Sequence, residues 1–211
     1  MYMLRNATTA LSLAFALFSG LSIAQETGVD VDDKGFLTGK KVAIVYYSHS
    51  GETYSSTGEY PNLKHGNTEI VAENIKKNVK DATLFKLEIV GKYPEKYDEM
   101  TQYVKEQQEK QVLPELKCIP DVSEYDIIFV GTPVWWGQMS LPVASFLQKA
   151  NLAGKIVIPF ITHEGSGESG IGEAMQRASE CQKVMPALVI KGSEASESED
   201  VIKKFIDTLK E

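Results

Sequence analysis

The chain has few residues that bind metals or form cross-links, and it has no excess of positive charge. Its two cysteines, Cys118 and Cys181, match no metal-binding spacing, and the three histidines, His49, His65 and His163, lack partners at ligand spacing. We therefore expect no metal site. The two cysteines could pair in an oxidising compartment or remain small buried side chains, and the sequence leaves both open. With 22 basic against 29 acidic residues the net charge is −7, which argues against nucleic acid as a partner.

Long hydrophobic runs are also missing after the first two dozen residues. In residues 1–24 the only charged residue is Arg5, and an apolar run follows it. Ser22 and Ala24, near the end of this segment, are small. This is the pattern of a secretory signal peptide, and the run is interrupted by too many Ser and Thr residues for a span that needs about 20 apolar positions. We expect residues 1–24 to be a cleaved signal peptide and residues 25–39 to be a polar linker. The mature protein would then be exported to the periplasm or secreted, with no stable insertion into the membrane.

From residue 40 onward, short apolar runs alternate with segments of helical spacing. The expected strands are residues 42–47, 83–90, 125–130, 155–162 and 185–191, and the expected helices are residues 67–80, 95–112, 141–150, 170–180 and 197–210. Continuous apolar runs are typical of strands buried on both faces of a parallel sheet. Residues 40–211 should therefore form one α/β domain, a three-layer sandwich around a five-stranded parallel sheet. Gly131, Thr132 and Pro133 should stop the third strand, and Pro159 is unusual inside a central one.

The loop after the first expected strand has the composition of a phosphate site. Ligands of such sheets bind at the carboxyl ends of the strands. Hydroxyl groups and free backbone N–H groups at a helix N-terminus suit a phosphate, and this loop carries no Lys or Arg between residues 48 and 51. Residues 52–66 interrupt the loop, either as a cover over the site or as a surface loop. An ordinary Ser- and Gly-rich turn between a strand and a helix is the alternative. The candidate phosphate-binding residues are Ser48, Ser50, Gly51, Asn67 and Thr68, and Asn67 or Thr68 should cap the helix.

The loop after the third expected strand holds both tryptophans of the chain. A planar aromatic ligand can stack on such rings. We expect one of the two to be structural and Trp136 to be the stacking ring. The candidate residues of this loop are Thr132, Pro133, Val134, Trp135, Trp136 and Gly137.

The loop after the fourth expected strand is rich in Gly and Ser. Its glycines match G-x-G-x-x-G, but a dinucleotide fingerprint belongs after the first strand. Backbone N–H groups offered to a ligand's carbonyl edge are the better interpretation. The candidate residues are Thr162, His163, Glu164, Gly165, Ser166 and Gly167.

Together, YYSHSG, GNT, GTPVWWG and THEGSG resemble the flavodoxin family, especially its flavodoxin-like branch of bacterial FMN proteins. The resemblance covers roughly residues 40–211, nearly all of the mature chain. The resemblance implies strand order 2-1-3-4-5 and FMN as the cofactor, rather than FAD, since no extra segment is present for an adenine half. It implies that the first loop holds the phosphate, the second wraps the isoalloxazine with a stacked Trp, and the third faces the polar edge of the ring. His163 and Glu164 are larger than the residues expected there.

Two redox functions remain open from the sequence, beside a flavin-binding or degenerate domain without turnover. One is an oxidoreductase that passes electrons from NAD(P)H through FMN to a quinone-like or other acceptor, often in a pocket at a homodimer interface. The other is a non-enzymatic electron carrier that docks to redox partner proteins, which the negative charge permits. The flavin does the redox chemistry in both. The sequence identifies neither the electron donor nor the acceptor.

Overall fold

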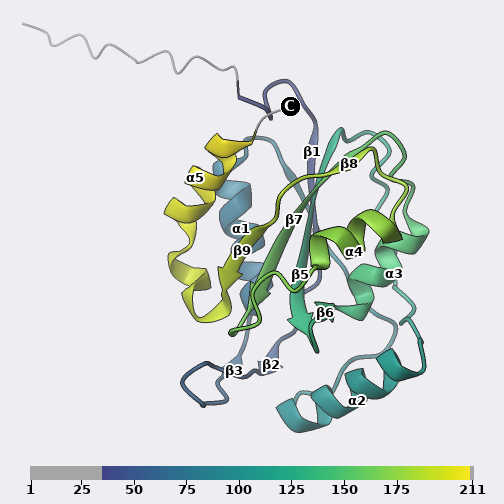
Figure 1. Cartoon of the computed structure of the whole chain (residues 1–211), viewed down its shortest axis with the longest axis vertical. Helices are drawn as coiled ribbons and strands as arrows, with labels where there is room; N and C mark the ends of the chain where they lie inside the picture. The colour runs from purple at the N-terminus through teal and green to yellow at the C-terminus, as the bar shows by residue number, and fades with distance from the viewer. Residues whose placement is uncertain (1–34, 210–211) are drawn as a thin grey trace, which may run out of the picture. The chain divides into compact units, whose positions relative to one another are not determined.

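The computed structural model describes residues 35–209, which fold around a mostly parallel sheet (Figure 1). Its strands run in the order β4-β1-β5-β7-β8, and β9 extends the β8 edge by pairing with β7. The parallel strands are β1 (Val42–Tyr46), β4 (Thr83–Lys86), β5 (Ile127–Trp135), β7 (Ile156–His163), β8 (Lys183–Val184) and β9 (Leu188–Lys191). Counting β8 and β9 as one interrupted strand, this is the order 2-1-3-4-5, so the predicted α/β topology is confirmed.

Helices cover both faces of the sheet. α1 (Asn67–Asn78) and α5 (Glu199–Thr208) lie to the left of the sheet in Figure 1, and α3 (Leu141–Lys149) and α4 (Ile171–Ala178) lie to its right. α2 (Tyr97–Glu109) lies at the lower end, towards which the carboxyl end of β5 points. The sandwich therefore has three layers, as its alternating strands and helices predict.

The core explains why the strand sequences are apolar without alternation. In β5, Ile127 and Phe129 join the cluster beneath α1 and α5, whereas Ile128 and Val130 join the cluster beneath α3 and α4. All four side chains are fully buried. Because successive side chains of a strand point to opposite faces, a strand covered on both sides must be apolar at every position.

The predicted stop of the third strand at residues 131–133 is wrong, because β5 continues to Trp135. Gly131, Thr132 and Pro133 pair in parallel with residues 160–162 of β7. A Cβ at Gly131 would overlap the ring of Phe160, so this glycine makes room for packing and does not end the strand. The chain then turns back at Trp136 and Gly137 into β6 (Gln138–Met139), which pairs antiparallel with the end of β5.

Other predicted boundaries also shift. The fifth expected strand, residues 185–191, is reduced to β9 at residues 188–191, and β8 lies just before its expected start. The terminal helix is preceded by the 3₁₀ helix η1 (Gly192–Glu197). β7 pairs with β8 at residues 156–157 and with β9 at residues 160–163, so Pro159 lies where the edge strand is interrupted and no partner there needs its missing N–H. The second expected strand ends at Lys86, four residues early. At the interruption of the first loop, the chain forms the short antiparallel hairpin of β2 (Gly51–Glu52) and β3 (Asn62–Leu63).

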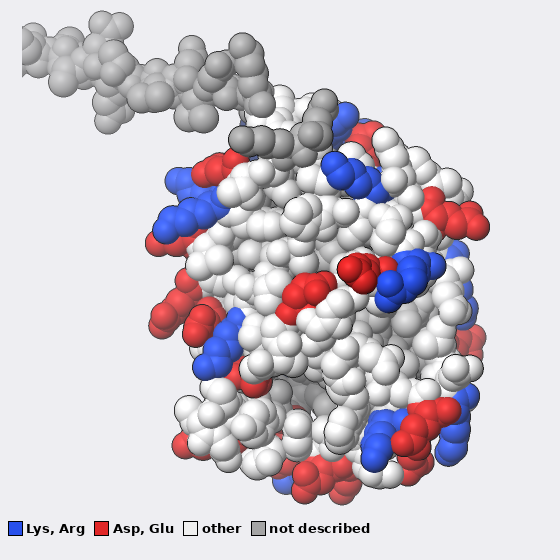
Figure 2. All heavy atoms as spheres, in the orientation of Figure 1, with Lys and Arg blue, Asp and Glu red and all other residues white. Residues whose placement is uncertain are grey.

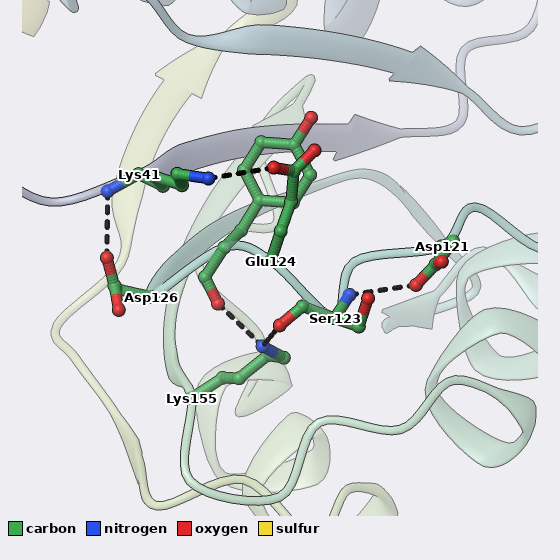
Figure 3. A network of polar contacts seen from close by, with 7 residues as sticks. Lys41, Asp121, Ser123, Glu124, Asp126 and Lys155 are labelled. Carbon is green, nitrogen blue, oxygen red and sulfur yellow. Dashed lines mark hydrogen bonds and ion pairs between the residues drawn. The ribbon is translucent and has the colours of Figure 1, made fainter.

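Polar contacts tie the strand starts together at the opposite edge of the sheet (Figure 3). The backbone N–H of Lys41, before β1, donates to Asp126, before β5, at 2.8 Å. The buried ammonium of Lys155, before β7, donates to the carbonyl oxygens of Ser123 at 2.8 Å and Tyr125 at 2.6 Å. Lys155 thus gives two backbone carbonyls a charged donor, and all these contacts lie at the amino ends of the strands, opposite the carboxyl edge.

The remaining sequence predictions concern the N-terminal segment, the two cysteines and membrane insertion. The signal peptide and most of the linker fall within residues 1–34, which lie outside the described part. Cys118 is exposed and Cys181 is buried, and neither forms a disulfide. Among residues 35–209, no helix is both long and apolar enough to cross a membrane.

Candidate functional site

A cavity of about 270 Å³ lies at the carboxyl end of the sheet, between the three loops singled out from the sequence. The lower part of the molecule is hollowed in Figure 2, and the side chains around the hollow are mostly neutral. The cavity wall includes Ser48, Asn67, Thr68, Pro133, Val134, Trp135, Trp136, Thr162, His163, Glu164 and Ser166 from those loops. The hairpin β2–β3 and helix α2 add Thr53, Tyr54, Leu63, Tyr97, Met100, Thr101 and Val104, and His49 and Gly192 complete the wall.

One corner of the cavity is the N-terminus of α1. Gly66 is the N-cap, in place of the expected Asn67 or Thr68, and the hydroxyl of Ser48 accepts a hydrogen bond from the N–H of Glu69 at 3.0 Å. A Cβ at Gly66 would overlap the carbonyl oxygen of His49 and the hydroxyl of Ser48, so only glycine lets the two segments approach this closely. The first-turn N–H groups of Asn67 and Thr68 have no helical acceptor, because none precedes them. This corner, the α1 cradle, consists of Ser48, Gly66, Asn67 and Thr68.

The remaining part of the predicted phosphate loop leaves the cavity. Ser50 is exposed, and Gly51 enters β2, where its neighbour Glu52 donates its N–H to the carbonyl of Glu95 at 2.8 Å. Gly51 has φ +112, and a Cβ there would overlap Glu95. Ser50 and Gly51 therefore direct the chain into the hairpin, and they do not line the cavity.

Two threonines join the loops to one another. The hydroxyls of Thr68 and Thr162 lie 2.7 Å apart in a buried hydrogen bond, which fixes the start of α1 against the end of β7. Thr132 is fully buried and lies off the cavity wall. Its hydroxyl accepts from the N–H of Ser140 at 2.8 Å and so closes the β5–β6 turn.

The two adjacent tryptophans have opposite environments. Trp135 is 8% exposed and packs edge-on against Tyr47 and Tyr93, with ring centroids 5.5 and 5.1 Å away. Trp136 is 56% exposed, and its indole N–H donates to the carbonyl of Thr101 at 3.0 Å. Trp136 and Gly137 both have positive φ, +50 and +72, as a two-residue hairpin turn requires. The turn thus holds a large aromatic side chain in a costly conformation at the cavity rim, while Gly137 lies outside the wall.

Glu164 joins the hairpin to the C-terminal part of the domain. Its carboxylate accepts from the N–H of Ser193 at 2.6 Å and from that of Ser56, at the hairpin tip, at 3.2 Å. At the hairpin base, the carboxylate of Glu52 pairs with Lys96 and accepts from the N–H of Tyr97 at 3.2 Å. The insertion is therefore fastened at both ends over one side of the cavity.

Within the third loop, His163, Glu164 and Ser166 line the cavity, and Gly165 and Gly167 do not. The N–H of Gly165 donates to Nδ1 of His163 at 2.9 Å. Gly165 and Gly167 have φ +125 and +65, which turns the loop around the cavity mouth. The expected row of free N–H groups is thus reduced by a contact within the loop.

Sequence reasoning missed the wall that α2 provides. Tyr97, Met100, Thr101 and Val104 line the cavity at a spacing of i, i+3, i+4 and i+7, which is one face of a helix. That spacing is visible in an otherwise polar segment and could have identified the wall. His49 was also missed as a lining residue. Burial lowers the pKa of His49, against a smaller opposing effect of Glu95.

The cavity is electrostatically neutral for a site that could receive an anion. No Lys or Arg lines it, and its one carboxylate, on Glu164, is engaged by two backbone N–H groups. Burial raises the pKa of both Tyr47 and Tyr93, so these phenols stay neutral. Among residues 35–209, no three His, Cys, Asp or Glu side chains gather as metal ligands would. The arrangement suits a planar aromatic ligand at Trp136 with an anionic end at the α1 cradle.

Comparisons with solved structures agree with this fold. A flavoprotein from Bacteroides uniformis is 22% identical, with TM-score 0.58, and the match covers 80% of this chain and 98% of that one. One from Bacteroides eggerthii is 18% identical over 77% and 98% of the two chains, with TM-score 0.56. A Lactobacillus acidophilus flavoprotein solved in complex with FMN is 24% identical over 75% and 97%, with TM-score 0.55.

Sequence comparison gives a more specific result. No curated protein matches the chain significantly. The family model described as flavodoxin matches residues 41–209, which includes every strand and helix of the described domain and all three loops around the cavity. The chain therefore belongs to the flavodoxin family.

Proposed function

We propose that the chain binds FMN in this cavity and passes electrons through it. The observation that carries the proposal is the cavity itself, which combines the α1 cradle with an exposed, conformationally strained Trp136 at its rim. Family membership and the FMN complex of the Lactobacillus acidophilus flavoprotein support FMN as the cofactor. Bound FMN would supply the redox chemistry, and the protein would supply binding and orientation.

The residues present fit the cofactor. A phosphate at the α1 cradle would meet first-turn N–H groups, the positive end of the helix dipole and neutral hydroxyls. The cradle is kept open by Gly66, where any side chain would fill the space. The isoalloxazine would stack on Trp136, while Pro133, Val134 and the α2 wall exclude water from its other contacts. His163, Glu164 and Ser166 would face the polar edge of the ring.

The direct test uses the purified chain and FMN. Binding should quench FMN fluorescence and perturb its visible absorption, with one FMN per chain. The absence of any change at micromolar FMN would contradict the proposal. A titration with FAD beside it tests the choice of cofactor.

Of the two redox functions, we propose an oxidoreductase that reduces a quinone-like or other small acceptor. The apolar side chains of Met100 and Val104 and the ring of Tyr97 support this choice, since a planar acceptor needs such a surface beside the flavin. Anaerobic NADH or NADPH should bleach the flavin, and a quinone should restore its colour. A flavin that stays yellow with both nicotinamides would instead favour an electron carrier. Mass measurement of the holo-protein in solution tests the homodimer.

We also propose that residues 1–24 direct export to the periplasm. The support is the pattern of Arg5, the apolar run and the small residues at Ser22 and Ala24. When the full chain is expressed in a bacterium, the periplasmic protein should begin at Gln25. Recovery of the uncleaved chain only from the cytoplasm would contradict this.

A further inference from the structure

His49 has a polar atom that the fold leaves without a partner. This residue follows Ser48 of the α1 cradle and lines the cavity. Its Nε2 atom is buried and has no hydrogen bond, which among residues 35–209 is true of no other buried side-chain nitrogen or oxygen. An unpaired buried polar atom destabilises a fold, and native proteins keep one mainly where something else completes it.

Aromatic side chains contact the imidazole ring of His49, but no group within the described residues forms a hydrogen bond with its Nε2 atom. The ring lies edge-on to Trp135 and Tyr93, at centroid distances of 6.2 and 6.4 Å and interplanar angles of 79° and 87°. These contacts orient the ring without providing a hydrogen bond. The backbone of His49 meanwhile belongs to the cradle, because its carbonyl oxygen lies against Gly66. The side chain therefore lies between the cradle and the segment that carries Trp136.

The charges around His49 favour the neutral imidazole. Burial lowers its pKa, and Glu95, in the segment before α2, opposes this more weakly. The phenol of Tyr93 stays neutral, and the carboxylate of Glu164 across the cavity is bound by two N–H groups. A neutral imidazole protonated at Nε2 offers a single hydrogen-bond donor.

We propose that His49 binds the cofactor directly, with Nε2–H donating a hydrogen bond to an oxygen of the ribityl phosphate chain of FMN. The inference rests on the proposed FMN binding and adds to it a residue in the middle of the site. The α1 cradle would bind the phosphate of FMN, and Trp136 would stack on the isoalloxazine ring. His49 would bind the ribityl part of the cofactor between them.

The test compares two substitutions in the purified full chain. His49→Gln keeps an N–H donor near the position of Nε2, and His49→Leu keeps the bulk but removes the donor. In fluorescence titrations at pH 8, His49→Leu should bind FMN roughly five- to tenfold more weakly, the size of one lost neutral hydrogen bond, and His49→Gln should stay within about twofold of the wild type. Apo His49→Leu should melt no lower than the wild type, since it removes an unsatisfied atom.

The outcomes separate this inference from the proposal beneath it. Wild-type protein that fails to bind FMN would overturn the proposed function. Wild-type protein that binds FMN, with His49→Leu binding equally well, would overturn only the role of His49. Lumiflavin lacks the ribityl phosphate chain of FMN. If His49→Leu lost equal affinity for FMN and for lumiflavin, the assignment of the hydrogen bond to that part of the cofactor would be overturned. Should His49→Leu not fold, ¹⁵N spectra of the wild-type imidazole decide the question, because an Nε2 resonance that FMN leaves unmoved would also overturn it.

Discussion

Substitution of each of the two adjacent tryptophans separates cofactor binding from folding. Trp136 is 56% exposed, and its removal gives up one hydrogen bond to Thr101 and an exposed cation–π contact with Lys105, whose Nζ lies 5.7 Å from the ring centroid. Surface substitutions usually change stability by about 0.5 kcal/mol or less, so Trp136→Ala should leave the apo-protein nearly as stable as the wild type. An aromatic ring stacked on a nucleotide base contributes about 1–3 kcal/mol, and the same magnitude for the flavin predicts roughly 5- to 150-fold weaker FMN binding.

Trp135→Ala should have the opposite effect. The side chain is 8% exposed and packs against Tyr47 and Tyr93, so its removal leaves a cavity in the core. Substitutions of this kind cost about 3–5 kcal/mol of stability. The folded fraction of Trp135→Ala should still bind FMN more tightly than Trp136→Ala does.

Both effects are measurable on the same samples. Urea unfolding of the apo-proteins gives the free energy of unfolding, and quenching of FMN fluorescence gives the dissociation constant. Wild-type affinity in Trp136→Ala would refute the stacking role, and wild-type stability in Trp135→Ala would refute its structural one. A larger loss of affinity in Trp135→Ala would show that the two roles are exchanged.

Three further predictions follow from other parts of the structure. Gly66→Ala should lower stability by about 1–3 kcal/mol through overpacking and weaken FMN binding. Gly35→Ala, where a Cβ would meet nothing closer than Thr38 at 3.8 Å and φ is not positive, should bind FMN normally, and equal affinities of the two variants would refute the cradle. Burial lowers the pKa of folded His49 below the unfolded value of about 6.5, so its contribution to unfolding free energy is lost as pH falls through 6.5 towards the folded pKa. Urea unfolding at pH 5.5 and 7.5 should show a smaller loss on acidification for His49→Gln than for the wild type, and equal losses would contradict this. Lys155→Met leaves two carbonyls without their charged donor, so the free energy of unfolding measured with urea should fall by about 1–3 kcal/mol. FMN affinity should not change. Unaltered stability would show that the Lys155 contacts in Figure 3 do not support the fold.

The sequence predicts the sheet well because burial on both faces leaves a strong local signal. Every residue of β1 is apolar, as are Ile127 to Val130 of β5, and helical spacing separates the runs. Right-handed crossovers then restrict the topology to a few arrangements. The carboxyl edge, and with it the three loops, follows from strand direction alone.

Local sequence fails where tertiary contacts decide the conformation. Gly131 looks like a strand breaker, yet it is a strand residue that accommodates the ring of Phe160. The N-cap of α1 is Gly66, which has no side chain to cap the helix, and the hydroxyl that accepts the N–H of Glu69 comes from Ser48, 21 positions earlier. No helix-start pattern spans that distance. The hairpin of residues 51–63 is fastened by Glu52 and by the distant Glu164, so its order depends on partners that its own sequence does not reveal.

The candidate site is likewise predicted only in part, where strand direction decides the position of a residue. The structure brings Ser48, Asn67, Thr68 and Trp136 to one cavity, as expected from loops at one edge of a sheet. Ser50, Gly51 and Thr132 lie off the wall because hairpin pairing and a buried hydrogen bond take them away from it. Contact of the lining residues with FMN stays a prediction.

Chemical-shift mapping of FMN binding tests the central claim most directly. In ¹H–¹⁵N spectra of the labelled protein, stoichiometric FMN should shift the backbone amides of Asn67 and Thr68 and the indole N–H of Trp136. Amides of the groove between α3 and α4, which Ala144 and Ala174 line on the other side of the β5–β6 turn, should stay in place. Shifts confined to that groove, or spectra that FMN leaves unchanged, would contradict an FMN site at the carboxyl edge of the sheet.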